Sequence, residues 1–277
     1  MTPRQALLDC GAGDAGSVSW ASAVRHMSGV RAAECQRALP GLQSVHAAVF
    51  PYYTPPEPGG NLCLYARGED YHRVLHRRME NAASALRARH GAHVFVPFTD
   101  ASPFPEVLLA GLCGLGAHGQ NGLLITPRFG SYVFIGLLAS TLPWPEAQVG
   151  ETPCLGCMAC RAACPGGALG ENGLEPERCL SHITQKRGEL DEVQRALVRE
   201  SALIWGCDCC QTACPMNRTA GQTALPEFRD RLLHSLSEDD CRLSDRQFRK
   251  KYRDRAFCWR GVAPLRRNLA LQKEQTE

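Results

Sequence analysis

The sequence Cys154-Leu-Gly-Cys157-Met-Ala-Cys160-Arg-Ala-Ala-Cys164-Pro165 decides the fold of the middle of this 277-residue chain. Its spacing is C-x2-C-x2-C-x3-C-P, in which three thiolates hold one 4Fe-4S cluster and the fourth cysteine reaches a second cluster. The short spacings let consecutive thiolates wrap one face of a cube, and the proline ends the turn. The stretch therefore predicts one half of a two-cluster module.

A second run, Cys207-Asp-Cys-Cys210-Gln-Thr-Ala-Cys214-Pro215, has the last three cysteines of this pattern and lacks the first. Cys179 can fill the vacancy. Crossing the fourth cysteines, as two-cluster ferredoxins do, gives two ligand sets. Cluster 1 would be held by Cys154, Cys157, Cys160 and Cys214, and cluster 2 by Cys164, Cys179, Cys207 and Cys210. Cys209 has no cluster in this assignment, because it lies inside the two-residue gap and would point away.

A disulfide framework and a pair of zinc sites are the alternatives. Zinc motifs rarely carry four cysteines in so dense a run before a proline, and disulfides need an oxidising compartment. We find no targeting segment between Met1 and Val18 and no apolar run long enough to span a membrane, so we expect a cytoplasmic protein with reduced thiols. The scattered cysteines are then expected to be small buried apolar residues, namely Cys10, Cys35, Cys63, Cys113, Cys241 and Cys258.

Upstream of the cysteines, predicted strands alternate with predicted helices as far as about residue 145. We expect helices over 18–39, 65–90 and 105–115, strands over 44–50, 94–98, 123–125 and 132–138, and a further helix over 190–205. The overall fold class is then α+β. An α/β domain over residues 1–145 would precede a ferredoxin-like double-cluster domain over 146–220 and a basic helical tail over 221–277.

The tail has an uneven composition. The net charge of +3 is too small to imply nucleic-acid binding, but arginines and lysines are concentrated between residues 229 and 267. They alternate with Phe248, Tyr252, Phe257 and Trp259. Such a segment can follow a phosphate backbone and stack on bases. The alternative is an amphipathic helical tail that docks on the body of the protein.

Several motifs, taken in order, resemble the epoxyqueuosine reductase family over about residues 39–270. They are Tyr65-Ala-Arg-Gly-Glu-Asp70-Tyr71-His72, Thr99-Asp100-Ala-Ser-Pro-Phe-Pro-Glu106, Gly114-Leu-Gly-Ala-His-Gly-Gln120-Asn121, Gly130-Ser131, Cys179-Leu-Ser181, Gly206-Cys207-Asp208-x-Cys210-Gln211 and Arg267-Asn268. The resemblance implies an oxidoreductase that uses cobalamin and two 4Fe-4S clusters to reduce epoxyqueuosine to queuosine in tRNA. It also implies that the upstream domain resembles that of the reductive dehalogenases.

The same resemblance implies that base-off cobalamin lies between the α/β domain and the clusters, and that Asp100 donates a proton. Asp100 would have to be protonated at neutral pH, so we expect burial against the corrin to raise its pKa. Spacing alone favours a different role, the N-cap of a helix that starts near Pro105.

The remaining site residues also come from the resemblance. Tyr71 and His72 would lie near the cofactor. The alternative for His72, which its position on the helix face favours, is an ordinary surface histidine. The corrin pocket would be lined by the segments 124–126 and 131–135, which include Leu124, Thr126, Ser131 and Ile135, with Ser181 and Asp208 approaching from the cluster side. Arg187 and the basic tail would contact tRNA. We further expect a monomer that receives electrons from a low-potential donor such as flavodoxin or ferredoxin.

The chain departs from the family pattern in three places. Gln120 replaces a lysine, Gln185 replaces a glutamate in a segment one residue shorter than usual, and the sequence stops soon after Asn268, where typical members continue into helical repeats. A corrinoid reductase of the same architecture with another substrate is therefore an alternative. A non-catalytic, ferredoxin-like electron carrier is a second one.

Overall fold

A four-stranded antiparallel sheet is the centre of the first half of the chain, in a computed structural model that describes residues 1–145, 153–171 and 173–274. Its strand order is β1-β2-β6-β3, formed by Asp14–Ser19, Ser44–Pro51, Val133–Ser140 and Phe95–Phe98. A separate pair of short strands, β4 (Ala117–His118) and β5 (Leu124–Ile125), lies beyond α5 in the chain. The expected α+β class is confirmed, with an antiparallel sheet in the first domain.

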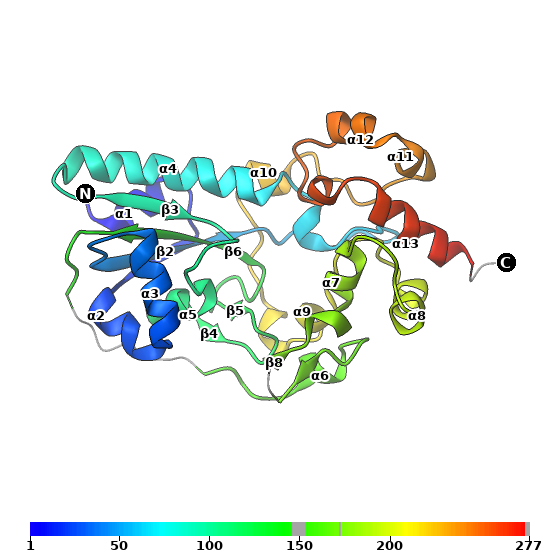
Figure 1. Ribbon diagram of the computed structural model, residues 1–277, viewed down its shortest axis with the longest axis horizontal. Coiled ribbons are helices and arrows are strands. Elements are labelled where there is room, and N and C mark those ends of the chain that lie inside the picture. Colours follow the sequence, from blue (N-terminus) through cyan, green and yellow to red (C-terminus); the bar gives the residue numbers. More distant parts are fainter. Residues whose placement is uncertain (146–152, 172, 275–277) are drawn as a thin grey trace.

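Helices cover both faces of this sheet (Figure 1). The helices α1 (Pro3–Asp9) and α4 (Tyr71–Arg89) pack on one face around Phe50, Leu75 and Phe95. On the other face, α2 (Trp20–Ala23), α3 (Gly29–Ala38) and α5 (Glu106–Leu112) enclose a second core. Every residue of β2 is buried because this strand is paired on both edges and covered on both faces.

The four predicted strands are confirmed, but the prediction of one helix over 18–39 is wrong. Val18 lies in β1, which pairs with β2. The Ser19 hydroxyl then accepts a hydrogen bond from Ser22 N–H and begins α2, and Ser28 caps α3 through Arg31 N–H. The short 3-10 turn η1 (Val24–His26) separates the two helices. The segment breaks up because edge pairing and two serine N-caps outweigh its helical periodicity.

Helix α4 brings the Tyr71-His72 motif to one end of the sheet. It begins one residue after Asp70, whose carboxylate accepts the His72 N–H, so the predicted start at residue 65 is too early. Tyr65 lies in the preceding 3-10 turn η2 (Leu64–Ala66). Buried residues recur along α4 at helical spacing, at Val74, Leu75, Met79, Ala82, Ala83 and Leu86, which fixes the helix on the sheet.

The cysteine-rich region consists of short elements. They are α6 (Ala159–Ala162), β7 (Leu169–Gly170), β8 (Gly173–Leu174), η3 (Pro176–Arg178), α7 (Leu180–Gln185), α8 (Glu192–Glu200), α9 (Cys209–Thr212) and η4 (Pro215–Asn217). The predicted helix over 190–205 is realised only as α8. Ile204 and Trp205 leave it to form backbone hydrogen bonds with Asn61 and Cys63 of the first half. The segment 146–152, where we expect the cluster domain to begin, lies outside the described residues.

The last segment contains α10 (Pro226–Arg229), α11 (Glu238–Arg242), α12 (Asp245–Lys251), η5 (Ala256–Arg260) and α13 (Ala263–Lys273). Phe248, Tyr252 and Phe257 are buried in a core shared with Leu62 and Trp205. The expectation that these three rings stack on bases is therefore wrong, and docking on the body is confirmed. Trp259 is 51% exposed, with the Arg260 guanidinium 3.7 Å from its ring centre.

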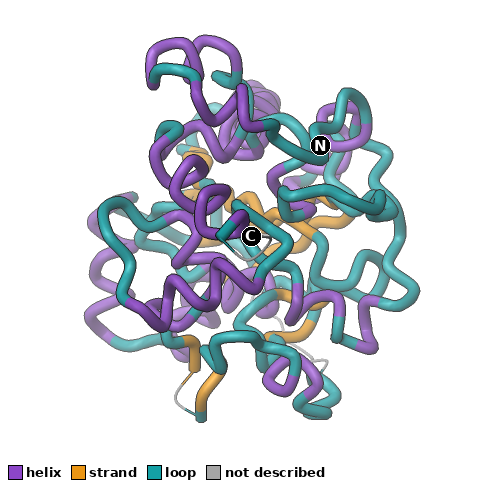
Figure 2. Tube along the Cα trace, turned by 90° about the vertical axis from the view of Figure 1, so that its right-hand side faces the viewer, coloured by secondary structure: helices purple, strands orange, loops and turns teal. Residues whose placement is uncertain are grey.

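The end of the molecule that carries the C-terminus is built from helices and loops, with most strands behind them (Figure 2). Four of the six scattered cysteines, Cys35, Cys63, Cys241 and Cys258, are buried in the hydrophobic cores, as expected. Within the described residues, no helix is long and apolar enough to cross a membrane.

Candidate functional site

Asp100 lies in the loop after β3 and is bound by two side chains from the first turn of α4. Its Oδ2 accepts a hydrogen bond from the Tyr71 hydroxyl at 2.7 Å and one from Nε2 of His72 at 3.0 Å. Its Oδ1 accepts the N–H of Ala101 at 2.8 Å. Asp100 has a φ of +54°, a left-handed conformation that is uncommon for a residue other than glycine. The loop is therefore held in a strained shape by side-chain contacts.

His72 is placed to carry a positive charge. Its Nδ1 lies 2.7 Å from Asp70 and its Nε2 lies 3.0 Å from Asp100. A neutral imidazole has only one N–H, so two carboxylate partners fit the imidazolium form. Burial alone would lower the pKa of His72, but the hydrogen bonds to Asp100 and Asp70 raise it to about 9. The start of a helix disfavours a cation by about 0.3–1 kcal/mol. Two charge-assisted hydrogen bonds exceed that, even after screening at a partly exposed site.

Asp100 itself is ionised in this arrangement. The hydrogen bond from His72 holds the pKa of Asp100 well below its usual value, against partial burial, and the Tyr71 hydroxyl adds to the effect. The Asp100 side chain is 52% exposed. The expectation that burial raises the pKa of Asp100 is therefore wrong for this arrangement. The N-cap alternative is wrong as well, because α5 begins at Glu106 with Pro105 at the N-cap position.

A second carboxyl, Glu106, lies behind Asp100. It accepts the backbone N–H of Asp100, and its Oε1 is buried with no hydrogen-bond partner. Burial raises the pKa of Glu106 to about 7. Two neighbouring carboxyls thus have pKa values shifted in opposite directions, a pattern found at sites that move protons.

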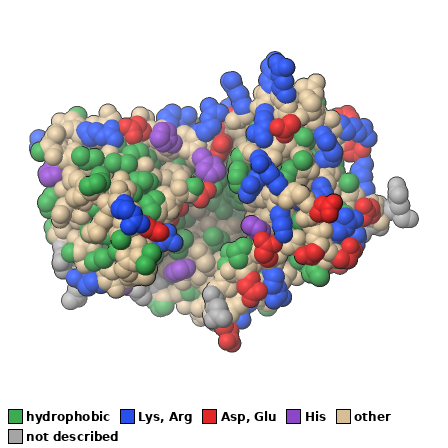
Figure 3. Space-filling model, viewed as in Figure 1, with side chains coloured by type: hydrophobic (Ala, Val, Ile, Leu, Met, Phe, Trp, Pro, Cys, Tyr) green, Lys and Arg blue, Asp and Glu red, His purple; other side chains and the backbone are tan. Residues whose placement is uncertain are grey.

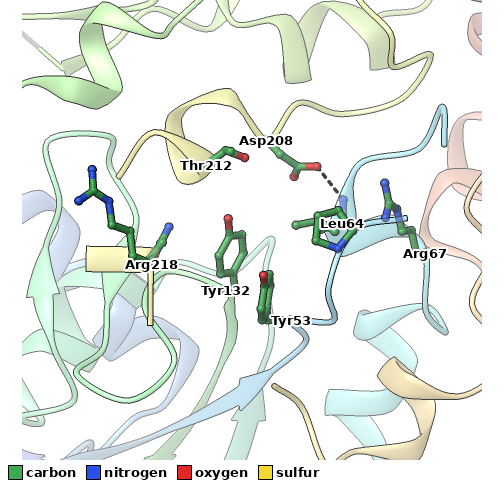
Figure 4. Close-up of a pocket in the computed structure, with 9 residues that line it drawn as sticks. Tyr53, Leu64, Arg67, Tyr132, Asp208, Thr212 and Arg218 are labelled. Carbon is green, nitrogen blue, oxygen red and sulfur yellow. Dashed lines mark hydrogen bonds between the residues drawn. The ribbon is translucent and has the colours of Figure 1, made fainter. Parts of the chain in front are cut away.

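The face shown in Figure 3 is hollowed between the two halves of the molecule. A pocket of about 250 Å³ has walls from both halves, because Tyr53 and Tyr132 come from the sheet domain and Asp208 and Thr212 from the cysteine-rich region. Figure 4 shows the two tyrosines facing Asp208 and Thr212 across the pocket, with Arg67 and Arg218 on opposite sides. Pro56, Leu64 and Asn217 complete the lining.

Asp208 connects this pocket to the cysteines, since it lies between Cys207 and Cys210 in the sequence. Its Oδ2 accepts the N–H of Leu64 at 2.9 Å, whereas its Oδ1 is buried without a partner. Burial raises the pKa of Asp208 to about 6, although the Leu64 N–H and Arg67 oppose the shift. The expected position of Asp208 on a pocket wall is supported by this geometry.

The cysteines gather in two neighbouring groups. Cys154, Cys157, Cys160 and Cys214 line one small cavity together with Gln120, Asn121, Ile125, Met158 and Pro215. These four are the cysteines assigned to cluster 1. Burial raises the pKa of Cys210 to about 12, and the nearby thiols of Cys179, Cys164 and Cys160 contribute to the shift. Cys207 and the exposed Cys209 lie close to each other. In the described ranges, no three His, Cys, Asp or Glu side chains are arranged to hold a single metal ion.

The other expected lining residues lie elsewhere on the same framework. Leu124 packs in the core beside α5, and Ile135 of β6 packs against the same core. The Thr126 hydroxyl accepts the Phe129 N–H and donates to the Gly130 carbonyl, which stabilises a turn. Ser131 is buried and bonded to Gln211 and Asn217, whereas Ser181 lies in the first turn of α7. Arg187 is exposed beside Asp245. Among these, none lines the described pocket.

Sequence reasoning did not single out most of the pocket wall. Tyr53, Arg67, Asn217 and Arg218 were not identified, and neither was the buried state of Glu106. Tyr132 belongs to the segment 131–135, which was expected to line the corrin pocket. Arg67 lies within the motif 65–72, so proximity to this motif was an available signal.

Two protein-family descriptions match separate parts of the chain. Residues 33–101 match "Epoxyqueuosine reductase QueG, DUF1730", and residues 153–217 match "4Fe-4S double cluster binding domain". The second match covers all eight cysteines assigned to the clusters. It supports the assignment of this region as a double 4Fe-4S domain.

Curated relatives named epoxyqueuosine reductase cover most of the chain. The protein from Bacillus cereus is 32% identical over 248 residues, which are 85% of this chain and 65% of that relative. The protein from Lactococcus garvieae is 35% identical over 210 residues, which are 73% of this chain and 58% of that relative. The chain thus spans about three fifths of the length of these relatives.

Solved structures agree with the fold. Epoxyqueuosine reductase from Streptococcus thermophilus superposes with a TM-score of 0.82 at 23% identity, covering 97% of this chain and 79% of that one. A crystal structure of epoxyqueuosine reductase with a tRNA-Tyr epoxyqueuosine-modified tRNA stem loop also gives a TM-score of 0.82, at 25% identity and the same coverage. On the family matches and the curated relatives together, this chain belongs to the epoxyqueuosine reductase family.

Proposed function

We propose that this protein reduces epoxyqueuosine to queuosine in tRNA, with two 4Fe-4S clusters and a base-off cobalamin as cofactors. One observation carries the proposal: a single pocket has tyrosines of the sheet domain on one wall and Asp208, between two cluster cysteines, on the other. A group bound there would lie next to the iron-sulfur centres. The relative with a bound epoxyqueuosine-modified stem loop supports this choice of substrate.

The residues present fit a corrinoid. Tyr53 and Tyr132 offer flat aromatic surface to a macrocycle. The amide groups around a corrin need polar partners, and the buried, unpartnered Oδ1 of Asp208 is one such acceptor. Arg67, Thr212 and Arg218 supply donors at the edges. When bound, cobalamin would supply a strongly reducing cobalt centre that the clusters can reduce by single-electron transfer.

Asp100 and His72 would hold and transfer the protons that the reaction needs. The ring of Tyr65 lies 6.3 Å from that of Tyr71, whose hydroxyl donates to Asp100, and the neighbouring Leu64 N–H donates to Asp208. We assign Asp100 as the group that meets the epoxide oxygen. Because Asp100 is ionised, the proton it delivers is taken from His72, which holds it between two carboxylates.

A corrinoid reductase acting on another substrate is the second candidate. It is favoured by the burial of Phe248, Tyr252 and Phe257, which removes three of the four rings expected to stack on bases. Exposed Arg187 lies on the turn that the Arg267 side chain holds through the carbonyls of Lys186 and Gly188, and it is our candidate RNA contact. A low-potential electron donor, a monomeric state and a cytoplasmic location stay predictions.

The test is anaerobic reconstitution with iron, sulfide and cobalamin, followed by incubation with an epoxyqueuosine-containing tRNA stem loop and a low-potential reductant. Mass spectrometry of the nucleosides should show queuosine. A corrinoid absorption spectrum without salt-dependent RNA binding would favour the second candidate. Failure to bind any corrinoid would leave only the electron-carrier alternative.

A further inference from the structure

The environment of the Glu106 side chain indicates that this residue binds a proton as well as supporting the Asp100 loop. An ionised carboxylate with one oxygen buried and unpartnered is costly, because the charge has lost water and gained nothing in return. Oε1 of Glu106 is in that position, while the carboxyl accepts the Asp100 N–H. Adding a proton removes the charge and leaves the hydrogen bond to Asp100 in place.

The proposed reaction consumes two protons. Reducing an epoxide to an alkene breaks both C–O bonds, forms the C=C bond, takes up two electrons and two protons and releases water. The electrons come from the clusters, which a low-potential donor then reduces again. His72 can supply one proton through Asp100. The described site therefore needs a second proton close to Asp100.

We propose that Glu106 is a positioning residue that stores this second proton and returns it to the Asp100–His72 pair. This inference rests on the proposed function. The titratable and charged groups that face Glu106 are Asp100 from its own loop and Tyr71 and His72 from α4. Burial is the largest influence and favours the protonated form of Glu106. The charge of Asp100 acts in the same direction, whereas the Asp100 N–H and His72 favour the ionised form. The resulting pKa of about 7 lets Glu106 both hold and release a proton near neutral pH.

Glu106→Gln is the informative variant, because the amide oxygen can still accept the Asp100 N–H but the side chain cannot store a proton. Infrared spectra of the cluster-loaded protein without substrate should show the carbonyl stretch of a protonated carboxyl that fades as pH rises through about 7. The band should be missing in Glu106→Gln and present in Glu80→Gln, a control at a half-exposed carboxylate paired with Arg87. With substrate, kcat of Glu106→Gln should fall about 10²-fold with little change in KM. The change in kcat with pH near 7 that the wild type shows should disappear in Glu106→Gln.

Glu106→Asp keeps a titratable carboxyl and should restore part of the rate and the band, which separates proton storage from support of the loop. An unchanged band in Glu106→Gln, or wild-type kcat with the wild-type pH profile, would overturn the inference. If Glu106→Gln does not fold, Glu106→Asp can assign the infrared band instead. Its carboxyl band should titrate at a different pH from that of the wild type. If the wild type shows the band yet never converts epoxyqueuosine, the proposed function fails while the proton store stands.

Discussion

Asn217 and Ser131 are joined by two hydrogen bonds across the boundary between the cysteine-rich region and the sheet. The Ser131 N–H donates to Oδ1 of Asn217 at 2.7 Å, and Nδ2 of Asn217 donates to the Ser131 hydroxyl at 2.8 Å. Nδ2 also donates to the Gln211 carbonyl at 2.7 Å. Asn217 lies three residues beyond Cys214, so this contact fixes the position of a predicted cluster ligand against the start of β6.

Replacing Asn217 by alanine should lower the free energy of unfolding by about 2–3 kcal/mol, because the buried Ser131 N–H loses its acceptor and the Ser131 hydroxyl and Gln211 carbonyl each lose a donor. Urea unfolding under anaerobic conditions measures the change. Gln5→Ala, which removes an exposed hydrogen bond to Asp9, is the control and should change stability by less than about 0.5 kcal/mol. Equal stability of the two variants would contradict the account of this boundary.

The contact between Ser131 and Asn217 requires a glycine at position 130. Its φ is +56°, and an added Cβ would lie 2.1 Å from Oδ1 of Asn217. Gly114 has a similar φ of +79° but open space around the Cβ position, so it isolates the backbone effect. Gly114→Ala should cost about 1–2 kcal/mol of stability. Gly130→Ala should cost clearly more, because Asn217 must move, and thermal unfolding of the two variants should separate them.

His46 makes stability depend on pH. It is fully buried in β2 between the hydroxyls of Ser17 and Ser44, and burial lowers its pKa from 6.5 to about 3. The unfolded chain binds a proton that the folded protein excludes, so stability is full above pH 6.5 and is lost as pH falls toward 3. Between pH 7 and pH 5 the loss should be about 2 kcal/mol.

Urea unfolding at the two pH values measures this loss. His46→Gln should flatten the dependence, whereas His118→Gln, at an exposed position, should retain it. If the free energy of unfolding of His46→Gln changes with pH as steeply as that of the wild type, a group other than His46 causes the pH dependence.

The crossed assignment of the clusters predicts a specific loss of iron. Cys214→Ala should remove cluster 1, because Cys214 shares a cavity with Cys154, Cys157 and Cys160, and should leave the cluster bound by the other four cysteines. Iron and sulfide analysis after reconstitution should then give about half of the wild-type content. Cys241→Ala, at a buried cysteine outside both groups, is the control and should keep full iron content. Full content in Cys214→Ala would refute the assignment.

The sequence was most informative where spacing alone determines chemistry. The two cysteine runs could be recognised as a double 4Fe-4S domain because ligand spacing is local, and β2 could be identified because a buried strand leaves a continuous apolar run. The charge of Asp100 could not be predicted. It depends on Tyr71 and His72, which are 29 and 28 residues away and meet Asp100 only when α4 packs beside β3.

The C-terminal segment shows the same limit. Alternating basic and aromatic residues are compatible with both an RNA-binding surface and a docked face. Contacts with Leu62 and Trp205, far away in the sequence, decide that Phe248 and Phe257 are buried. Long-range packing of this kind leaves no local signal in the chain.

Asp100 is the point at which the proposed proton path and the proposed substrate meet. Asp100→Asn should keep both clusters and bound cobalamin, because Asp100 lines neither the described pocket nor the cavity of the four cluster 1 cysteines. It should lower conversion of the epoxyqueuosine stem loop by about 10²-fold or more, since the amide cannot relay a proton from His72. Asp14→Asn, at an exposed carboxylate paired with Arg4, is the matched control and should keep the wild-type rate.

The most direct test is the single-turnover yield of queuosine from that stem loop, measured by mass spectrometry for the wild type and Asp100→Asn at equal cluster and cobalamin content. The account predicts conversion by the wild type and near-complete loss in Asp100→Asn. Equal yields from the two proteins, or no queuosine from the fully loaded wild type, would contradict it.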